Sequence, residues 1–253
     1  MISGVFYIEA QGNSDEAVEK SLKGLIKQLK SEEGVEVVEE HFDDLTEENK
    51  LYSSVVDVNI NFKDFSTFLL IAIKYGPSAI EISRPKKLIL EKKEFLGAVM
   101  KVVDITKEFF EKHNIDFQFS TEENIQEDIG LSEAEIEDLI DLGALRVKII
   151  VEGEGSTRQK VMKDFVNIVK DDILVNKIKT KEMIKGQEFN GLVGIEAFIY
   201  EPKTLFDIAV KHRPILIELL EPDSIQIDIL QLQDIGLDLA GTFFEAAHKI
   251  QMQ

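Results

Sequence analysis

The sequence predicts an α+β protein built as a tandem duplication of one βαββαβ unit, with a further helix after each copy. Two observations predict this fold class. A proline-flanked segment recurs without a gap at an offset of 137 residues, and both halves show the same succession of strand and helix patterns. A strongly acidic segment separates the copies. The predicted organisation is therefore a first α/β repeat at 1–119, an acidic helical connector at 120–145 and a second α/β repeat at 146–253.

The repeat is clearest where residues 77–85 align with residues 214–222. Two prolines recur in register, and Glu81 aligns with Glu218. Near the start of each copy the offset becomes 142 or 143, which a change in loop length explains. A period this long is typical of duplicated domains, because solenoid repeats span only about 20–50 residues. Four further identities continue the offset of 137 backwards: Thr67 with Thr204, Ile71 with Ile208, Ala72 with Ala209 and Lys74 with Lys211.

The first copy begins with a strand, a helix and a second strand. Residues 5–10 and 35–42 have strand-like patterns, and a helix is expected from about Ser14 to Lys30, with Gly34 after its end. The helix is predicted because apolar residues fall on one stripe, namely Val18, Leu22, Leu25, Ile26 and Leu29.

The third expected strand, at residues 55–62, shows the cleanest alternation in the chain. Its apolar and polar side chains alternate, so one face is expected to lie in the core and the other to be exposed to solvent. A helix at about 64–74, a strand at 79–82 and a last helix through Phe95 and Phe109 complete the unit. The alternating side chains are Val56, Val58, Ile60 and Phe62 on one face and Asp57, Asn59 and Asn61 on the other.

This order of elements resembles the ferredoxin-like arrangement, an antiparallel sheet with helices on one face. The resemblance implies architecture alone. Ferredoxin-like folds host enzymes, metal carriers, RNA binders and metabolite sensors, so the topology does not choose among functions.

Composition excludes several classes of function. The chain of 253 residues has no cysteine, which excludes disulfides, thiolate metal sites and cysteine nucleophiles. A net charge of −19 opposes binding to nucleic acid, whose phosphates are neutralised by Lys and Arg. No segment reaches the roughly 18 apolar residues of a membrane span, and the N-terminus lacks the basic start of a secretion signal. A cytoplasmic protein that binds no membrane is therefore expected.

The connector carries nearly half of the net charge, with nine acidic residues and no basic one between residues 121 and 145. Ser132 and Glu135 have the spacing of a capping box, and Gly143 lies where a helix C-terminal cap is expected. A short docked helix is predicted, with an apolar face of Ile136, Leu139 and Ile140. Its charge would suit a basic protein partner or divalent cations.

The repeated Glu81 and Glu218 are candidate ligand-binding residues, together with His212. Two-fold related repeats can bring equivalent carboxylates together for acid–base or metal chemistry. The alternative is that each glutamate lies on the surface and binds water, as isolated carboxylates usually do. His41, His113, His212 and His248 show no short-range ligand spacing, so no metal site is predicted.

The loops at 9–14 and 152–156 each end a strand and open a helix, as a phosphate-binding turn would. Neither has a Gly-rich dinucleotide or Walker pattern, and nearby glutamates repel phosphate. No cofactor is therefore expected. Gly12 and Gly155 are interpreted as turn residues, with Ser14 and Ser156 as helix caps.

Surface charge differs between the copies after the repeated strand. Arg84, Lys86 and Lys87 in the first copy correspond to Glu221, Asp223 and Ser224 in the second. Complementary patches could pair the two halves or copies of the chain. Neutral drift is the alternative, because single surface pairs contribute little.

Phe198 and Tyr200 are further candidates for partner contact. They occupy the sheet face that carries Asn59 and Asn61 in the first copy. Aromatic side chains on a face that should be wet often mark a contact surface.

The leading hypothesis is a non-enzymatic binding or assembly module that binds a protein partner, a second copy or a small ligand near the repeat junction. The alternative is an enzyme with a carboxylate-based or metal-dependent site between the repeats, using Glu81, Glu218 and His212. A third hypothesis is nucleic-acid binding through a basic set of residues, namely Arg84, Lys86, Lys87, Lys92 and Lys93.

Overall fold

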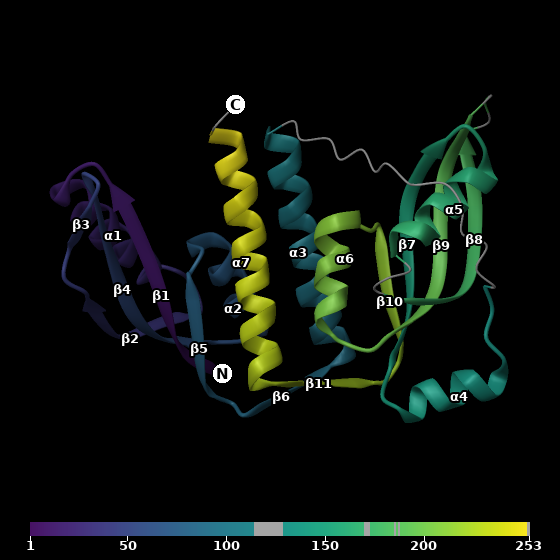
Figure 1. Cartoon of the computed structure of the whole chain (residues 1–253). Coiled ribbons are helices and arrows are strands. Elements are labelled where there is room, and N and C mark those ends of the chain that lie inside the picture. The colour runs from purple at the N-terminus through teal and green to yellow at the C-terminus, as the bar shows by residue number, and fades with distance from the viewer. Residues whose placement is uncertain (114–128, 170–172, 185, 187, 252–253) are drawn as a thin grey trace. The chain divides into compact units, whose positions relative to one another are not determined.

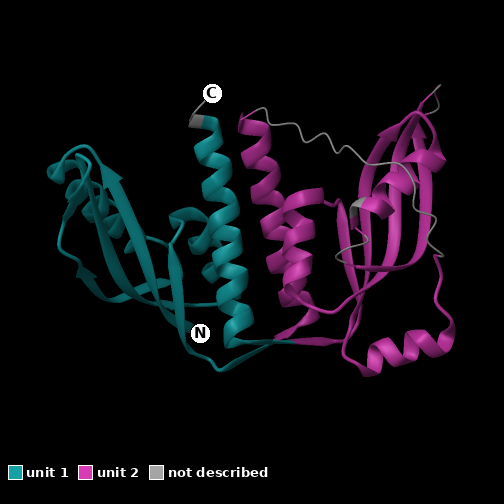
Figure 2. Cartoon of the chain, in the orientation of Figure 1, with its two compact units in different colours: residues 1–89, 226–253 teal, residues 90–225 magenta. Residues whose placement is uncertain are grey.

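The computed structural model describes residues 1–113, 129–169, 173–184, 186 and 188–251. Within these residues the protein is α+β, with antiparallel sheets and seven helices. The chain divides into two compact units, residues 1–89 with 226–253 (unit 1) and residues 90–225 (unit 2) (Figure 2). Each unit has its own core. No helix in the described part of the chain is both long and apolar enough to cross a membrane.

The sheet of unit 1 has the strand order β2-β4-β1-β5, and β1 is antiparallel to both of its neighbours. The predicted strands and helices of the first copy are confirmed, whereas two short strands, β3 (which pairs with β4) and β6 (Lys87–Glu91), were not predicted. The elements of this unit are β1 (Ile2–Gly12), α1 (Asp15–Leu29), β2 (Val35–Phe42), β3 (Thr46–Glu48), β4 (Leu51–Phe62), α2 (Phe65–Tyr75), β5 (Ala79–Arg84) and α7 (Ile229–Gln251) (Figure 1).

The core of unit 1 lies between this sheet and its helices. The apolar face predicted for β4 is fully buried, and the rings of Phe6 and Phe62 are 5.1 Å apart between centroids. Helix α7 packs close to α2 and β5, because a Cβ on Gly236 would lie 2.7 Å from Cζ of Phe68 and 2.9 Å from Cδ1 of Ile80. The core of unit 1 is therefore closed by the last helix of the chain.

Unit 2 contains a second antiparallel sheet, with the order β10-β7-β9-β8. Helix α3 packs here against α6, and the rings of Phe95 and Phe206 meet edge to face with centroids 5.7 Å apart. The elements are α3 (Lys92–His113), α4 (Glu133–Asp141), β7 (Leu145–Gly155), α5 (Arg158–Val169), β8 (Leu174–Ile184), β9 (Phe189–Ile199), α6 (Lys203–His212) and β10 (Leu216–Glu221) (Figure 1).

The compact units divide the chain differently from the repeats predicted at 1–119 and 146–253. Helix α3 follows the strands of the first repeat but packs in unit 2, and α7 follows the strands of the second repeat but packs in unit 1 (Figure 2). The chain changes unit within β6 (Lys87–Glu91) and β11 (Ser224–Asp228), which pair with each other. An amphipathic stripe shows that a helix is covered but does not show which sheet covers it.

The connector helix α4 has the predicted capping box. The Ser132 side chain accepts a hydrogen bond from the Glu135 backbone N–H, and the Glu135 carboxylate accepts one from the Ser132 N–H. Gly143 follows the helix with φ at +83°, a value that favours glycine. Leu139 is buried against Phe198, so α4 is docked as predicted. Residues 120–128 of the predicted connector lie outside the described residues.

Candidate functional site

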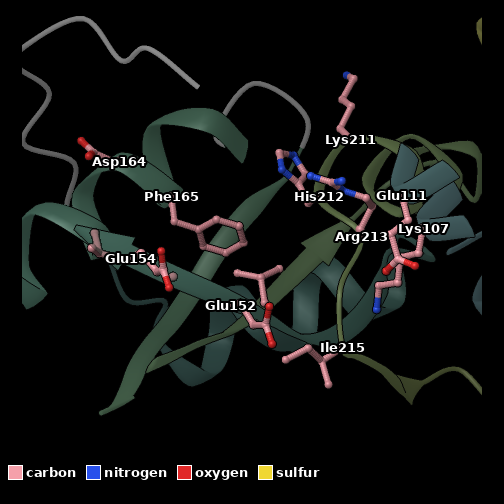
Figure 3. Close-up of a pocket in the computed structure, with 13 residues that line it drawn as sticks. Lys107, Glu111, Glu152, Glu154, Asp164, Phe165, Lys211, His212, Arg213 and Ile215 are labelled. Atoms are coloured by element: carbon pink, nitrogen blue, oxygen red, sulfur yellow. The ribbon is translucent and has the colours of Figure 1, made fainter. Parts of the chain in front are cut away.

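A hollow of about 600 Å³ in unit 2 is the candidate site (Figure 3). Four segments line it: the C-terminal half of α3, the last residues of β7, one side of α5 and the chain from the end of α6 to the start of β10. A volume of several hundred Å³ is typical of sites for small ligands. By chain position, α3 comes from the first predicted repeat and the other three segments from the second.

Arg213 lines this hollow, and its backbone has the left-handed conformation, which residues other than glycine rarely adopt. It ends α6 with φ 46° and ψ 54°, and its N–H donates to the Ala209 carbonyl. Gly76 ends α2 in the same conformation, with its N–H on the Ala72 carbonyl. Glycine takes this conformation freely, whereas another residue is strained by roughly 1 kcal/mol or more. Arg213 therefore occupies a backbone conformation that glycine would adopt without strain.

Two basic side chains are held in the hollow by groups that carry no negative charge. The Arg213 guanidinium lies over the Phe110 ring, 5.3 Å from its centroid, and Lys107 Nζ donates to the Pro214 carbonyl at 3.4 Å. Among the described residues, neither forms an ion pair with a carboxylate. Both therefore keep a positive charge that a bound group could neutralise.

Carboxylates line the same hollow. Figure 3 shows Glu111 beside Arg213, with Glu154 and Asp164 on the other side. Glu154 accepts a short hydrogen bond from the Asn190 side-chain amide. Glu111 and Glu152 form no ion pair within the described part of the chain. Among the described residues, Glu111 and Glu152 thus share the hollow with Lys107 and Arg213 without forming an ion pair with either.

The apolar part of the hollow comes from α5. Phe165 is buried, and its ring meets the His212 imidazole edge to face with centroids 6.0 Å apart. Helix α5 lies close to β7 because glycines face it: a Cβ on Gly153 or on Gly155 would lie 2.7 Å from a methyl group of Val161. These glycines are needed for packing, which agrees with the structural interpretation of Gly155.

The helix cap predicted after Gly155 is displaced by one residue. Thr157, and not Ser156, caps α5, because its hydroxyl accepts the Lys160 N–H at 3.1 Å. In the first repeat the prediction is confirmed, since the Ser14 hydroxyl accepts the Ala17 N–H at 3.2 Å. Sequence alone does not decide between adjacent Ser and Thr as the cap, because both hydroxyls can serve.

Of the three predicted ligand-binding residues, only His212 lines the hollow. Glu218 lies on β10 with a carboxylate oxygen 3.1 Å from Lys148 Nζ. Glu81 lies on β5 beside Tyr7, and burial of that phenol, followed by the Glu81 and Asp57 carboxylates, raises the pKa of Tyr7. Glu81 and Glu218 belong to different compact units, so a site shared by the two stays a prediction.

The residues that differ in charge after the repeated strand have polar neighbours inside their own unit. In unit 1, Arg84 Nε donates to the Ser3 hydroxyl at 2.9 Å. In unit 2, Glu221 lies 3.9 Å from Arg146, the counterpart of Ser3. Where the first copy has Arg84 beside Ser3, the second copy therefore has Glu221 near Arg146, so the neighbouring residue differs as well. Of the remaining residues, Lys86 and Lys87 are exposed. Asp223 forms an ion pair with Lys92, with 2.7 Å between Oδ1 and Nζ.

Phe198 does not lie on a free surface. It is 0% exposed because Leu139 and Ala144 cover it, so the contact predicted for this face is made by the chain's own connector. Tyr200, at the end of β9, is 61% exposed and remains accessible. Among the described residues, no group of three His, Asp or Glu side chains could hold a metal ion.

Comparison with known proteins assigns a family but no activity. The model of the MJ0538 family matches residues 4–253. This chain belongs to the MJ0538 family. A relative of the same family, "Uncharacterized protein MJ0538" of Methanocaldococcus jannaschii, is 32% identical over 254 residues, which cover 97% of this chain and 96% of the relative. No solved structure matches the chain. The match to the MJ0538 family therefore covers both predicted repeats and the predicted connector.

Proposed function

We propose that this protein is a non-enzymatic binding module that holds a small ligand in the hollow of unit 2. The observation that carries the proposal is the pair of basic side chains, Lys107 and Arg213, which face a hollow of about 600 Å³ without a carboxylate partner among the described residues. Buried or half-buried charges are normally paired, so charges left unpaired in a concave site are available to a ligand.

The strained backbone at Arg213 supports the same proposal. Strain that persists at a concave surface is often part of a binding site, and the inference runs from the observed outlier to the function. The arginine side chain is also ordered by its contact with Phe110, so little of its freedom would be lost when a ligand binds.

We also infer that the chain is a tandem duplication of a ferredoxin-like unit. Counted from the first strand of each repeat, both sheets have the order 4-1-3-2, once β3 is set aside as a hairpin addition. The equivalent helix ends at Gly76 and Arg213 support the same register. On this view the hollow lies at the repeat junction, because a helix of the first repeat completes a site on the second.

The test is a thermal-shift screen of the full chain against small metabolites. A ligand at about 100 times its Kd stabilises the folded protein by about 2.7 kcal/mol, which is visible as a rise in Tm. Each hit is repeated on Arg213→Gln and on Arg158→Gln, where Arg158 is an exposed arginine of the same unit outside the hollow.

We expect the rise in Tm to persist in Arg158→Gln and to be lost in Arg213→Gln. Hits that shift all three proteins equally would place the ligand elsewhere and contradict the proposal. A screen without hits would contradict it as well.

A further inference from the structure

The hollow of unit 2 holds unpaired charges of both signs. Lys107 and Arg213 provide the positive charges, and Glu111 and Glu152 provide the negative ones. Within the described part of the chain none of the four forms an ion pair, with each other or with a neighbour. A ligand with a single charge would satisfy one set and leave the other facing it, which costs affinity.

An apolar surface lies between the charged groups. Phe165 and Val161 of α5 are buried side chains that line the hollow, and Ile215, which is 43% exposed, lines it just before β10. Apolar surface in a charged site contributes affinity by removing the ligand's own apolar part from water. The arrangement therefore offers three kinds of contact: cationic, anionic and apolar.

We propose that the ligand of this hollow is a small zwitterion with an apolar body, such as an apolar α-amino acid. Its anionic group binds Arg213 and Lys107, its ammonium group binds Glu152, and its apolar part lies on Phe165 and Ile215. This inference rests on the proposed function, and it deepens it by naming the chemical class of the ligand.

Arg213 is suited to the anionic end because its guanidinium presents paired N–H donors to a carboxylate. Phe110 holds the guanidinium in place through its ring face, so the donors are ordered before the ligand arrives. Lys107 adds a second positive charge, and its contact with the Pro214 carbonyl leaves further ammonium protons for the ligand.

Isothermal titration calorimetry of the full chain with three matched probes tests the proposal. The probes are leucine, 4-methylpentanoate, which lacks the amino group, and isoamylamine, which lacks the carboxylate. We expect leucine to bind and each analogue to bind at least about tenfold more weakly, because each leaves one set of charges unpaired.

Two variants assign the ends of the ligand. Arg213→Gln is expected to weaken leucine and 4-methylpentanoate about tenfold or more and to leave isoamylamine unchanged. Glu152→Gln is expected to weaken leucine and isoamylamine about tenfold or more and to leave 4-methylpentanoate unchanged. Arg158→Gln and Glu182→Gln are the matched controls, because both residues are exposed in unit 2 and neither lines the hollow. Circular dichroism melting confirms that each variant is folded.

Equal binding of leucine and 4-methylpentanoate would overturn the zwitterion while leaving a ligand site in the hollow. Binding of none of the three probes, alongside a screening hit that Arg213→Gln abolishes, would also overturn it and leave the proposed function standing. Leucine binding that neither variant weakens would show that the zwitterion binds elsewhere, and would overturn the assignment.

Discussion

Arg213 and Gly76 occupy matching helix ends but differ in what they cost the fold. Both have positive φ, 46° and 54°, and both donate to the carbonyl of an alanine in the last turn. Only Arg213 has a side chain, and that side chain lies in the hollow. Position 213 thus combines a strained backbone with a side chain in the candidate site. Stability measurements can separate the effect of the strain from the effect of the side chain.

We predict that Arg213→Gly is more stable than Arg213→Ala by roughly 1 kcal/mol, because both variants lack the guanidinium but only glycine adopts this φ without strain. The measurement is urea denaturation followed by circular dichroism. In unit 1, Gly76→Ala should lose a similar amount, since open space surrounds its Cβ apart from a Phe244 contact at 3.7 Å. Equal stability of the two Arg213 variants would show that the helix end is unstrained.

Sequence comparison of the two copies could have identified Arg213 before the structure. The offset of 137 pairs it with Gly76, and an arginine replacing a helix-ending glycine is a visible difference. Lys107 offered no such signal, because it lies on a helix whose packing partner the sequence does not reveal. The proposed ligand site therefore joins one residue that could be predicted with another that required the three-dimensional contacts.

At the scale of elements, α4 sits beside a group of charged side chains at the edge of its apolar contact. Glu196 is 12% exposed, and its carboxylate accepts hydrogen bonds from Arg146 and Asn176. Asn176 also accepts the backbone N–H of Leu131, just before α4. Asn176 therefore hydrogen-bonds both to the segment just before α4 and to the Glu196 carboxylate.

Glu196 makes the stability of this region depend on pH. Burial alone would raise the pKa of Glu196, but hydrogen bonds from Arg146 and Asn176 outweigh burial and hold it below the usual value of 4.5. A carboxyl group with a lowered pKa in the folded state stabilises the fold above the unfolded pKa and loses that contribution as pH falls. Stability from Glu196 is therefore complete at neutral pH and declines below about pH 4.5.

We predict that Glu196→Gln lowers the free energy of unfolding by about 1–3 kcal/mol at pH 7, because a charged hydrogen-bond acceptor is replaced by a neutral one. The difference from the unmodified chain should shrink as pH falls below 4.5. Urea denaturation at several pH values between 7 and 3 measures it, with Glu137→Gln on the exposed side of α4 as the control. A difference that stays constant with pH would mean that the Glu196 charge contributes nothing.

The elements themselves were largely predictable, and the reason is visible in β4. From Ser54 to Phe62 its residues alternate between buried and half-buried, so Val56, Val58 and Ile60 mark one face from sequence alone. Strand β3 was missed because its three residues, Thr46–Glu48, are all exposed and carry no apolar pattern. A strand that is held by pairing with β4 and by Thr46 hydrogen bonds to Ser53, without buried apolar side chains, has no hydrophobic pattern in the sequence.

At the scale of the whole molecule, each compact unit contains a helix that follows the strands of the other predicted repeat. Gly236 of α7 lies against Phe68 and Ile80, so the core of unit 1 depends on residues about 150 positions away in sequence. The Gln233 side chain also accepts the Ile82 backbone N–H, at 3.0 Å. If the chain were instead divided at the predicted repeat boundaries, α7 would belong to the second repeat. That division predicts that the strands of the second repeat, and not those of unit 1, depend on α7.

We predict that a chain ending at residue 228 loses the fold of unit 1 and keeps that of unit 2. Without α7, Phe68 and Ile80 lose their cover, and exposing buried side chains of this size costs about 1.5–3 kcal/mol each. Every described element of unit 2 remains in the shortened chain. Hydrogen exchange read by mass spectrometry should show loss of protection in β1, β4 and α2, with protection retained in β7, β9 and α6.

Gly236→Val tests the same dependence without removing the helix. Its Cβ would meet the Phe68 and Ile80 side chains at distances that real Cβ contacts do not reach, so either these core side chains or α7 must shift. Gly241→Val, on the same helix with open space at its Cβ, is the matched control for the intrinsic helix propensity of valine. If hydrogen exchange instead increased in β7 and β9, α7 would stabilise the strands of the second predicted repeat. The assignment of α7 to unit 1 would then be wrong. Protection lost only in unit 1 would show that the strands and helices of residues 1–89 need α7 to fold, so the predicted repeat at 1–119 is not an independent folding unit.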